Sequence, residues 1–227
     1  MIKRIARTAG FAGLLAALLL TLLQSLWVTP LILEAETYEN GVEHSHAEEH
    51  DYADGHVHES WAPEDGWQRT LATGLSNLVV AVGFALMLAG LFTLHAPGKT
   101  WNGLLWGLGG FTTFSLAPSL GLPPELPGTE AADLLLRQYW WIGTAVATSI
   151  GLVLIAFARS WSLRISGAVL LAIPHLIGAP QPEVHTNLAP ETLANQFILA
   201  SLVTNALFWA ALGLSAAWLF GRNSRNA

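Results

Sequence analysis

Residues Thr70–Leu94 read TLATGLSNLVVAVGFALMLAGLFTL, a stretch without a single Asp, Glu, Lys or Arg. A helix needs about 20 consecutive, mostly apolar residues to cross the hydrocarbon core of a bilayer, and this stretch is long enough. The composition of the chain agrees, because 52% of its 227 residues are hydrophobic and only 11% are charged, whereas soluble domains carry about 25% charged residues. We therefore predict an integral membrane protein with a single domain over residues 1–227.

Five further stretches share this apolar character and also lack Asp, Glu, Lys and Arg. They cover about residues 9–33, 102–120, 139–158, 165–179 and 194–220. The sequence thus predicts an all-α membrane protein with about six transmembrane helices. Five is the alternative, because 165–179 is short and contains Pro174, and such a segment can be tilted, kinked or re-entrant. The first stretch has the basic start of a signal peptide, but it exceeds the usual apolar core of about 7–15 residues, which favours an uncleaved helix.

Lys and Arg are distributed unevenly about these stretches. With six helices, eight of the ten Lys and Arg residues fall on one side of the membrane, and only Arg69 and Arg137 fall on the other. Short loops rich in Lys and Arg stay in the cytoplasm, so the N and C termini are predicted to be cytoplasmic. All sixteen Asp and Glu residues, and seven of the eight His residues, then lie outside. The eight cytoplasmic Lys and Arg residues are Lys3, Arg4, Arg7, Lys99, Arg159, Arg164, Arg222 and Arg225.

The longest predicted outer loop, residues 34–66, is acidic and rich in histidine. Residues 34–65 read EAETYENGVEHSHAEEHDYADGHVHESWAPED and hold eleven of the sixteen acidic residues. In an extended backbone, residues two apart share a face, so each of the steps H-S-H and H-V-H can chelate one ion. In a helix, His46 and His50 share a face instead. The five histidines of the loop are His44, His46, His50, His56 and His58.

These side chains predict a site for a divalent cation of the first transition row. Imidazole and carboxylate together suit Co, Ni or Zn, and the sequence does not separate these three. Soft Cu(I) is disfavoured because the chain has no Cys and only two Met, and Ca or Mg sites do not recruit histidines. The other interpretation of residues 34–66 is a solvated, disordered acidic linker.

Three ionisable residues are candidates for an ion path beyond the loop. Glu34 and Glu36 close the first apolar stretch at its outer end, where they can pass an ion from the loop to the helices. His175 is the only ionisable residue near the interior of a predicted span, which is the usual mark of a functional group. It follows Pro174, which lacks a backbone donor, so the alternative is an imidazole bonded to the carbonyl group that the proline leaves free.

Uncharged polar residues also occur within the spans, where helix packing through hydrogen bonds is the expected role and the lining of a path is the alternative. A second polar group lies in the loop after the third span, near its outer mouth. Most Trp residues lie near the predicted interfaces with water, whereas Trp209 lies deep in the last span. The polar residues within the spans are Gln24, Asn77, Gln196 and Asn205, and those near the mouth are Glu125, Asp133, Arg137 and Gln138.

Several common functions lack their sequence signature in this chain. There is no Walker P-loop, so the chain does not itself use ATP. H-E-x-x-H and G-x-S-x-G are also absent, and no nucleophile is paired with a base, so an enzyme is not predicted. The sequence has no basic patch of the kind that binds nucleic acid, so nucleic acid is not a predicted partner. No cofactor is expected, and the predicted partners are the lipid bilayer and a divalent metal ion.

The sequence resembles the family of CbtA-type predicted cobalt transporter subunits over most of its length. The resemblance implies a multi-pass protein of the bacterial inner membrane that supplies cobalt for cobalamin synthesis. It also implies a small, His-containing membrane partner, the CbtB-type subunit. The family is commonly described with five spans, one fewer than the charges favour here. The matching stretches are PLILEAETYE with the His-rich run after it, EDGWQRTLATGLSNLVVAVGFALML, GLLWGLGGFTTFSLAPSLGLPPELPG, RQYWWIGTAVAT, PHLIGAP and ASLVTNALFWAALG.

Chemistry and resemblance together predict a cobalt uptake component of the inner membrane, with Co²⁺ as its transported substrate. The outer loop is expected to concentrate the ion by its electric field and by transient ligation. Ligation has to be weak enough to release the ion, because conduction requires exit as well as entry. The alternative is an accessory or sensor protein that binds the metal ion and transports nothing itself.

Overall fold

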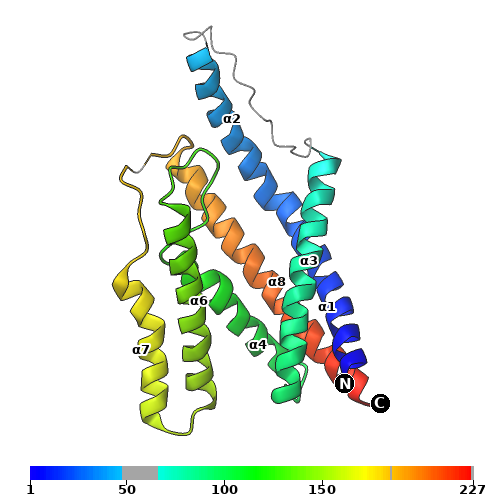
Figure 1. Cartoon of the computed structure of the whole chain (residues 1–227). Coiled ribbons are helices and arrows are strands. Elements are labelled where there is room, and N and C mark those ends of the chain that lie inside the picture. Colours follow the sequence, from blue (N-terminus) through cyan, green and yellow to red (C-terminus); the bar gives the residue numbers. More distant parts are fainter. Residues whose placement is uncertain (48–65, 185, 226–227) are drawn as a thin grey trace.

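The computed structural model describes residues 1–47, 66–184 and 186–225, and within these ranges the protein is built of helices without a strand (Figure 1). All six apolar stretches of the sequence are helical, as predicted. The helices and their short π-helical segments, labelled η, are α1 (Ile2–Leu23), η1 (Gln24–Val28), α2 (Thr29–Ala47), α3 (Trp67–Leu94), α4 (Asn102–Phe111), η2 (Thr112–Leu116), α5 (Ala117–Ser119), α6 (Leu134–Phe157), α7 (Trp161–Ile177) and α8 (Glu191–Arg225).

Four described helical segments are long and apolar enough to cross a membrane, and α7 is a shorter apolar helix. The segment 102–119 is helical throughout but is divided by η2. Large apolar side chains such as Leu75 and Val79 on α3 and Val153 on α6 are exposed, as expected of surfaces that face lipid. The four long segments are Ile2–Glu39, Trp67–Leu94, Leu134–Phe157 and Glu191–Arg222.

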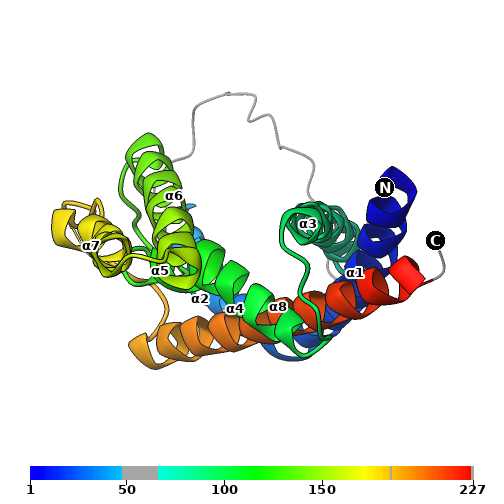
Figure 2. The ribbon, with the colours of Figure 1, turned by 90° about the horizontal axis from the view of Figure 1, so that it is seen from below.

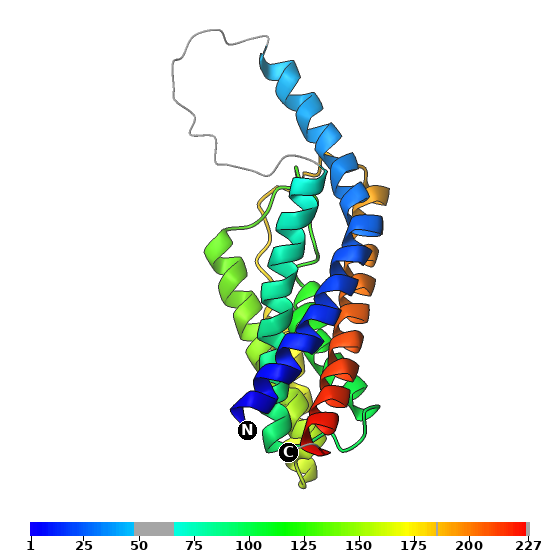
Figure 3. The same cartoon turned by 90° about the vertical axis from the view of Figure 1, so that its right-hand side faces the viewer.

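The first helix is longer than the sequence predicts. The predicted outer loop begins at residue 34, but α1, η1 and α2 form one continuous helical rod that reaches Ala47, so the helix continues into residues assigned to that loop. The polar sequence of α2 hid this, because hydropathy reports where a helix leaves the membrane and not where it ends. Figure 3 shows α2 projecting beyond the end of α3.

Each π-helical segment ends two residues before a proline. Pro30 follows η1 and Pro118 follows η2. A proline inside a helix cannot donate to the residue four positions earlier, and its ring crowds that carbonyl group. The wider π turn accommodates this, since Thr29 N–H donates to Gln24 O and Ala117 N–H donates to Thr112 O, each five residues back. Local widening of this kind lets the helix continue past the proline.

The helices form two unequal groups (Figure 2). The larger group comprises α1, α3, α4 and α8, with α4 packed on α8 and α1 packed on α3 and α8. Small side chains such as Ala12, Ala16, Ala85 and Ala216 fill its core, which lets helix backbones approach closely. The smaller group is the hairpin of α6 and α7, whose helical contact with the larger group runs mainly through η2 and α5.

The two ends of the bundle carry opposite charge among the described residues. Arg4 Nε donates to Phe220 O at 3.1 Å, and its guanidinium carbon lies 3.5 Å from the centroid of the Phe220 ring. The start of α1 and the last turns of α8 therefore share one end, here called the terminal end (Figure 1). The described segments with Asp and Glu, residues 34–47, 125–133, 183–184 and 186–191, lie at the other end, here called the acidic end.

Candidate functional site

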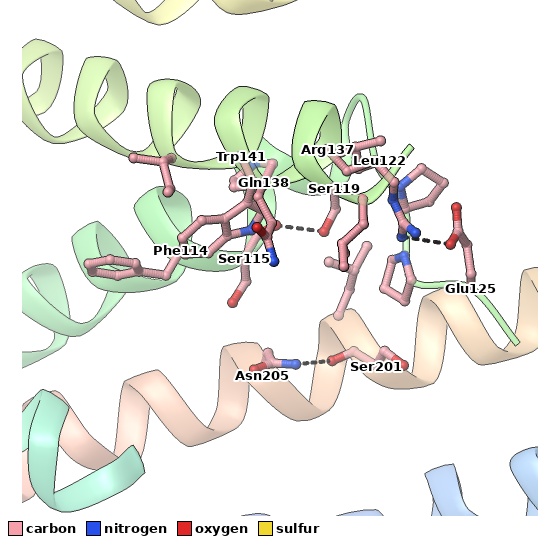
Figure 4. Close-up of a pocket in the computed structure, with 16 residues that line it drawn as sticks. Phe114, Ser115, Ser119, Leu122, Glu125, Arg137, Gln138, Trp141, Ser201 and Asn205 are labelled. Carbon is pink, nitrogen blue, oxygen red and sulfur yellow. Dashed lines mark hydrogen bonds and ion pairs between the residues drawn. The ribbon is translucent and has the colours of Figure 1, made fainter. Parts of the chain in front are cut away.

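A cavity of about 760 Å³ opens at the acidic end, between the η2–α5 segment, α6 and α8. Its volume falls within the usual range of about 300–1,000 Å³ for ligand sites. Figure 4 shows Phe114 at one end of this acidic-end cavity and Glu125 with Arg137 at the other. Its polar lining residues are Ser115, Ser119, Glu125, Arg137, Gln138, Ser201 and Asn205.

An ion pair stands at the mouth of this cavity. Arg137 Nη2 lies 2.7 Å from Glu125 Oε2, and each side chain is 28% exposed. Asp133 sets the position of Arg137, because its carboxylate accepts from the backbone N–H groups of Leu135 and Leu136 and so starts α6. The sequence placed Glu125, Arg137 and Gln138 near a mouth, and all three line the cavity, whereas Asp133 caps a helix.

Oxygen atoms line the deeper part of the cavity. Asn205 Nδ2 donates to Ser201 O at 2.9 Å, and its Oδ1 has no donor among the described residues. Ser119 Oγ donates to Ser115 O at 2.6 Å. Figure 4 shows Asn205 on α8 across from Ser115 and Gln138. Amide and hydroxyl oxygens can replace waters of a hydrated divalent cation, so the chemistry of this lining suits such an ion.

The other polar groups of the spans serve packing where the structure shows their bonds. Asn77 Nδ2 donates to Thr21 Oγ1 at 3.0 Å and to Gln24 Oε1 at 2.7 Å. This joins α3 to the α1–η1 rod between their packed faces. Gln24 and Asn77 therefore have the packing role expected of them, whereas Asn205 takes the alternative and lines a cavity.

A second cavity of about 530 Å³ lies toward the terminal end, between α3, α4 and α6. Most of its lining is apolar, and its polar side chains are His95, Asn102, Thr113 and Ser149. The His95 ring lies 4.8 Å from the Phe157 ring and 6.2 Å from the Trp106 ring, between centroids. Sequence reasoning did not single out His95, although its place at the cytoplasmic end of a predicted span, unlike all other histidines, was a signal.

The two glutamates at the end of the first span lie on α2. Glu36 forms an ion pair with Arg69 at the start of α3, with Nη2 2.5 Å from Oε1 and Nη1 3.1 Å from Oε2. The backbone oxygen of Glu34 accepts from Thr37 Oγ1 at 2.7 Å. Glu36 thus fixes the α1–α2 rod to α3 at the acidic end, and neither glutamate lines the cavities described above.

The structure describes the backbone at two of the five loop histidines. Residues 44 and 46 lie in the helical backbone of α2, so the extended form of the H-S-H step is not present there. His50, His56 and His58 lie outside the described residues. Within the described part of the chain, no three His, Asp or Glu residues are grouped as metal ligands. Metal binding by the loop histidines, Glu34 and Glu36 therefore stays a prediction.

His175 lies in the last turn of α7, at the contact with α6. Trp140 Nε1 donates to Pro174 O at 3.2 Å, and the Trp140 and His175 rings are 6.0 Å apart between centroids. The imidazole makes no hydrogen bond to another described residue and lines neither cavity. The structure does not bring His175 together with Glu34 or Glu36, and its role on an ion path stays a prediction.

Membrane-length helices and ends of opposite charge indicate a multi-pass membrane protein. Residues 2–221 match the family described as probable cobalt transporter subunit (CbtA), and the chain belongs to this family. The resemblance seen in the sequence is thereby confirmed. Neither the curated proteins nor the solved structures give a match to this chain.

Proposed function

We propose that the protein carries Co²⁺ across the bacterial inner membrane into the cytoplasm. The observation that carries this proposal is the acidic-end cavity, which has hydroxyl, amide and carboxylate groups among its lining residues, in a bundle whose family is that of probable cobalt transporter subunits. The terminal end faces the cytoplasm, because Lys and Arg in short loops and termini favour that side. The acidic end then meets the ion from outside and attracts it by its negative field.

The His-rich segment 34–66 captures the ion ahead of the cavity. The α1–α2 rod supports this, since it carries residues 44 and 46 beyond the bundle on a helix that Glu36 and Arg69 fix to α3. Glu34 and the loop histidines ligate Co²⁺ transiently, and weak ligation lets the ion move on. Glu36 can ligate the ion only after its ion pair with Arg69 breaks. His175 lines neither cavity, so it can affect transport only through its position in the α6–α7 hairpin.

Replacing His44, His46, His50, His56 and His58 together by Ala tests this capture. Uptake of Co²⁺ by cells at limiting cobalt is expected to fall about tenfold, which corresponds to about 1.4 kcal/mol of lost binding. Uptake at saturating cobalt stays near that of the unchanged protein, because the cavity and the bundle remain. Protein abundance in the membrane is the control. Unchanged uptake at limiting cobalt would contradict capture by these histidines.

The word subunit in the family description supports a protein partner. We propose that this partner is the small CbtB-type membrane subunit and that the imported cobalt is used for cobalamin synthesis. A second candidate function, a metal-binding accessory or sensor, is favoured by the projection of α2 beyond the end of α3. Reconstitution into vesicles separates the two functions. A transporter accumulates Co²⁺ in the lumen, whereas an accessory protein binds it at the acidic face without accumulation.

A further inference from the structure

Phe114 is shared by the two cavities. It lines the acidic-end cavity together with Ser115 and Asn205, and it lines the terminal-end cavity together with Thr113 and Ser149. The acidic-end cavity reaches outward to Glu125, and the terminal-end cavity reaches His95 at the far end of α3. The two cavities therefore adjoin at Phe114, one reaching toward the acidic end and the other toward the terminal end.

Aromatic rings from three other helices surround Phe114. Its ring is stacked on Trp209 of α8, with centroids 5.7 Å apart and planes inclined by 6°. The ring of Phe84 on α3 lies 5.0 Å away, and that of Trp141 on α6 lies 6.3 Å away. Trp209 itself is 1% exposed, which explains a Trp far from either interface. Together these rings form an apolar cluster around Phe114, and an apolar constriction opposes the passage of a hydrated, doubly charged ion.

The regular helical hydrogen bonding is interrupted at Phe114. Phe114 lies in the middle of η2, and Pro118 stands four residues later. Pro118 has no N–H to donate to the Phe114 carbonyl group, so the regular helical bond at this point is absent. π turns inside α-helices are frequent at functional sites. η2 also joins the α6–α7 hairpin to the larger group, so that movement of the hairpin reaches Phe114 directly.

We propose that Phe114 is the gate of a route for a hydrated divalent cation that runs through these two cavities; this inference rests on the proposed transport function. The ion exchanges waters for the oxygens of Ser115, Gln138 and Asn205 on the acidic side. Displacement of the Phe114 ring connects the cavities by water. His95 is the first imidazole that the ion meets on the terminal side.

The absence of cysteine from the chain makes the gate directly testable. Asn205→Cys places a single thiol in the acidic-end cavity, and Ser149→Cys places one in the terminal-end cavity. A membrane-impermeant, charged maleimide is added to right-side-out and inside-out membrane vesicles. We expect Asn205→Cys to react from the acidic side only, and Ser149→Cys from the terminal side only. Reaction of Ser149→Cys from the acidic side, or its failure to react from the terminal side, would overturn the proposal.

The second step removes the ring. Phe114→Ala in the Ser149→Cys chain is expected to raise labelling from the acidic side at least about tenfold, because an apolar constriction that is widened fills with water. Phe111→Ala is the matched control, since Phe111 lies one turn away in α4 and lines neither cavity. If the Phe114→Ala protein is not found in the membrane, the same comparison is made between Phe114→Leu and Phe111→Leu. Equal labelling in the Phe114 and Phe111 variants would overturn the gate.

Labelling and transport fail separately. The maleimide reports access of water to each cavity and needs no cobalt, whereas accumulation of Co²⁺ by the unchanged protein tests the proposed function. If labelling occurs on the expected sides but Co²⁺ does not accumulate, the proposed transport function is contradicted and the proposal that Phe114 is a gate still stands. If Co²⁺ accumulates but labelling is the same with and without the Phe114 ring, the gate is contradicted and the proposed transport function still stands. If the protein has the opposite orientation in the membrane, the results for right-side-out and inside-out vesicles are exchanged, and each thiol still reacts from one side only.

Discussion

Gly107→Val is expected to remove most of the folded protein from the membrane. Gly107 of α4 lies against the backbone of α8, and a Cβ atom there would fall inside contact distance of the Trp209 carbonyl oxygen. Gly103 and Gly213 meet at the same crossing, each against the backbone carbonyl oxygen of the other. Backbone atoms cannot move away as the end of a flexible side chain can. The loss in free energy of unfolding should therefore reach the upper part of the range of about 1–3 kcal/mol for overpacking, or exceed it.

The measurement is the amount of monodisperse protein in mild detergent and its midpoint of thermal unfolding. Gly109→Val is the matched control, because it introduces the same side chain into the same helix at a position where a Cβ atom meets nothing within 4 Å. Both variants share the cost of a β-branched residue in a helix. Equal losses in the two would show that the α4–α8 crossing is not what holds these helices together.

The two halves of the Arg137–Glu125 pair are expected to change cobalt uptake in opposite directions. Glu125→Gln leaves the charge of Arg137 alone at the mouth of the acidic-end cavity, where it repels Co²⁺. Arg137→Gln frees the Glu125 carboxylate to attract the ion. One unit charge at ~8 Å from a divalent ion is worth about 1–4 kcal/mol for an effective dielectric between about 80 and 20. The half-saturating cobalt concentration should therefore rise at least about fivefold in the first variant and fall in the second.

Uptake measured over a range of cobalt concentrations gives both values. Glu130→Gln is the control for Glu125→Gln, since it removes the same charge from the same loop at a residue that bonds Thr186 Oγ1 and does not line the cavity. A pair that only stabilises the fold would give losses of the same sign in both variants, together with lower abundance. That result would remove Glu125 from the path of the ion.

Much of the helical layout is readable from short stretches of the sequence. The stretch 70–94 and its five relatives are all helical, and the charges that separate them do lie at two ends of the bundle. The continuation of the first helix through residues 34–47 was not readable, because no apolar periodicity marks it. The polar residues near the mouth were also visible in the sequence, since Pro-rich loops with charged residues stand out between apolar stretches.

The candidate site was only partly readable. Sequence chemistry pointed to Glu34, Glu36 and His175, which lie on different parts of the bundle and line neither cavity. It did not point to Phe114, because one phenylalanine among nine carries no signal by itself. Asn205 was noticed as polar, but its neighbour across the cavity, Gln138, lies 67 positions earlier in the chain.

The sequence by itself indicated a helical, multi-pass membrane protein, and it showed which stretches are apolar enough to cross a bilayer. These follow from the partitioning of each short stretch between water and lipid, which depends on its own residues. Only the tertiary structure decided that α3, η2, α6 and α8 bring four aromatic rings together, with Phe114 among them lining both cavities. A cavity is the space that packing leaves between helices distant in sequence, so no single stretch of the chain can specify it.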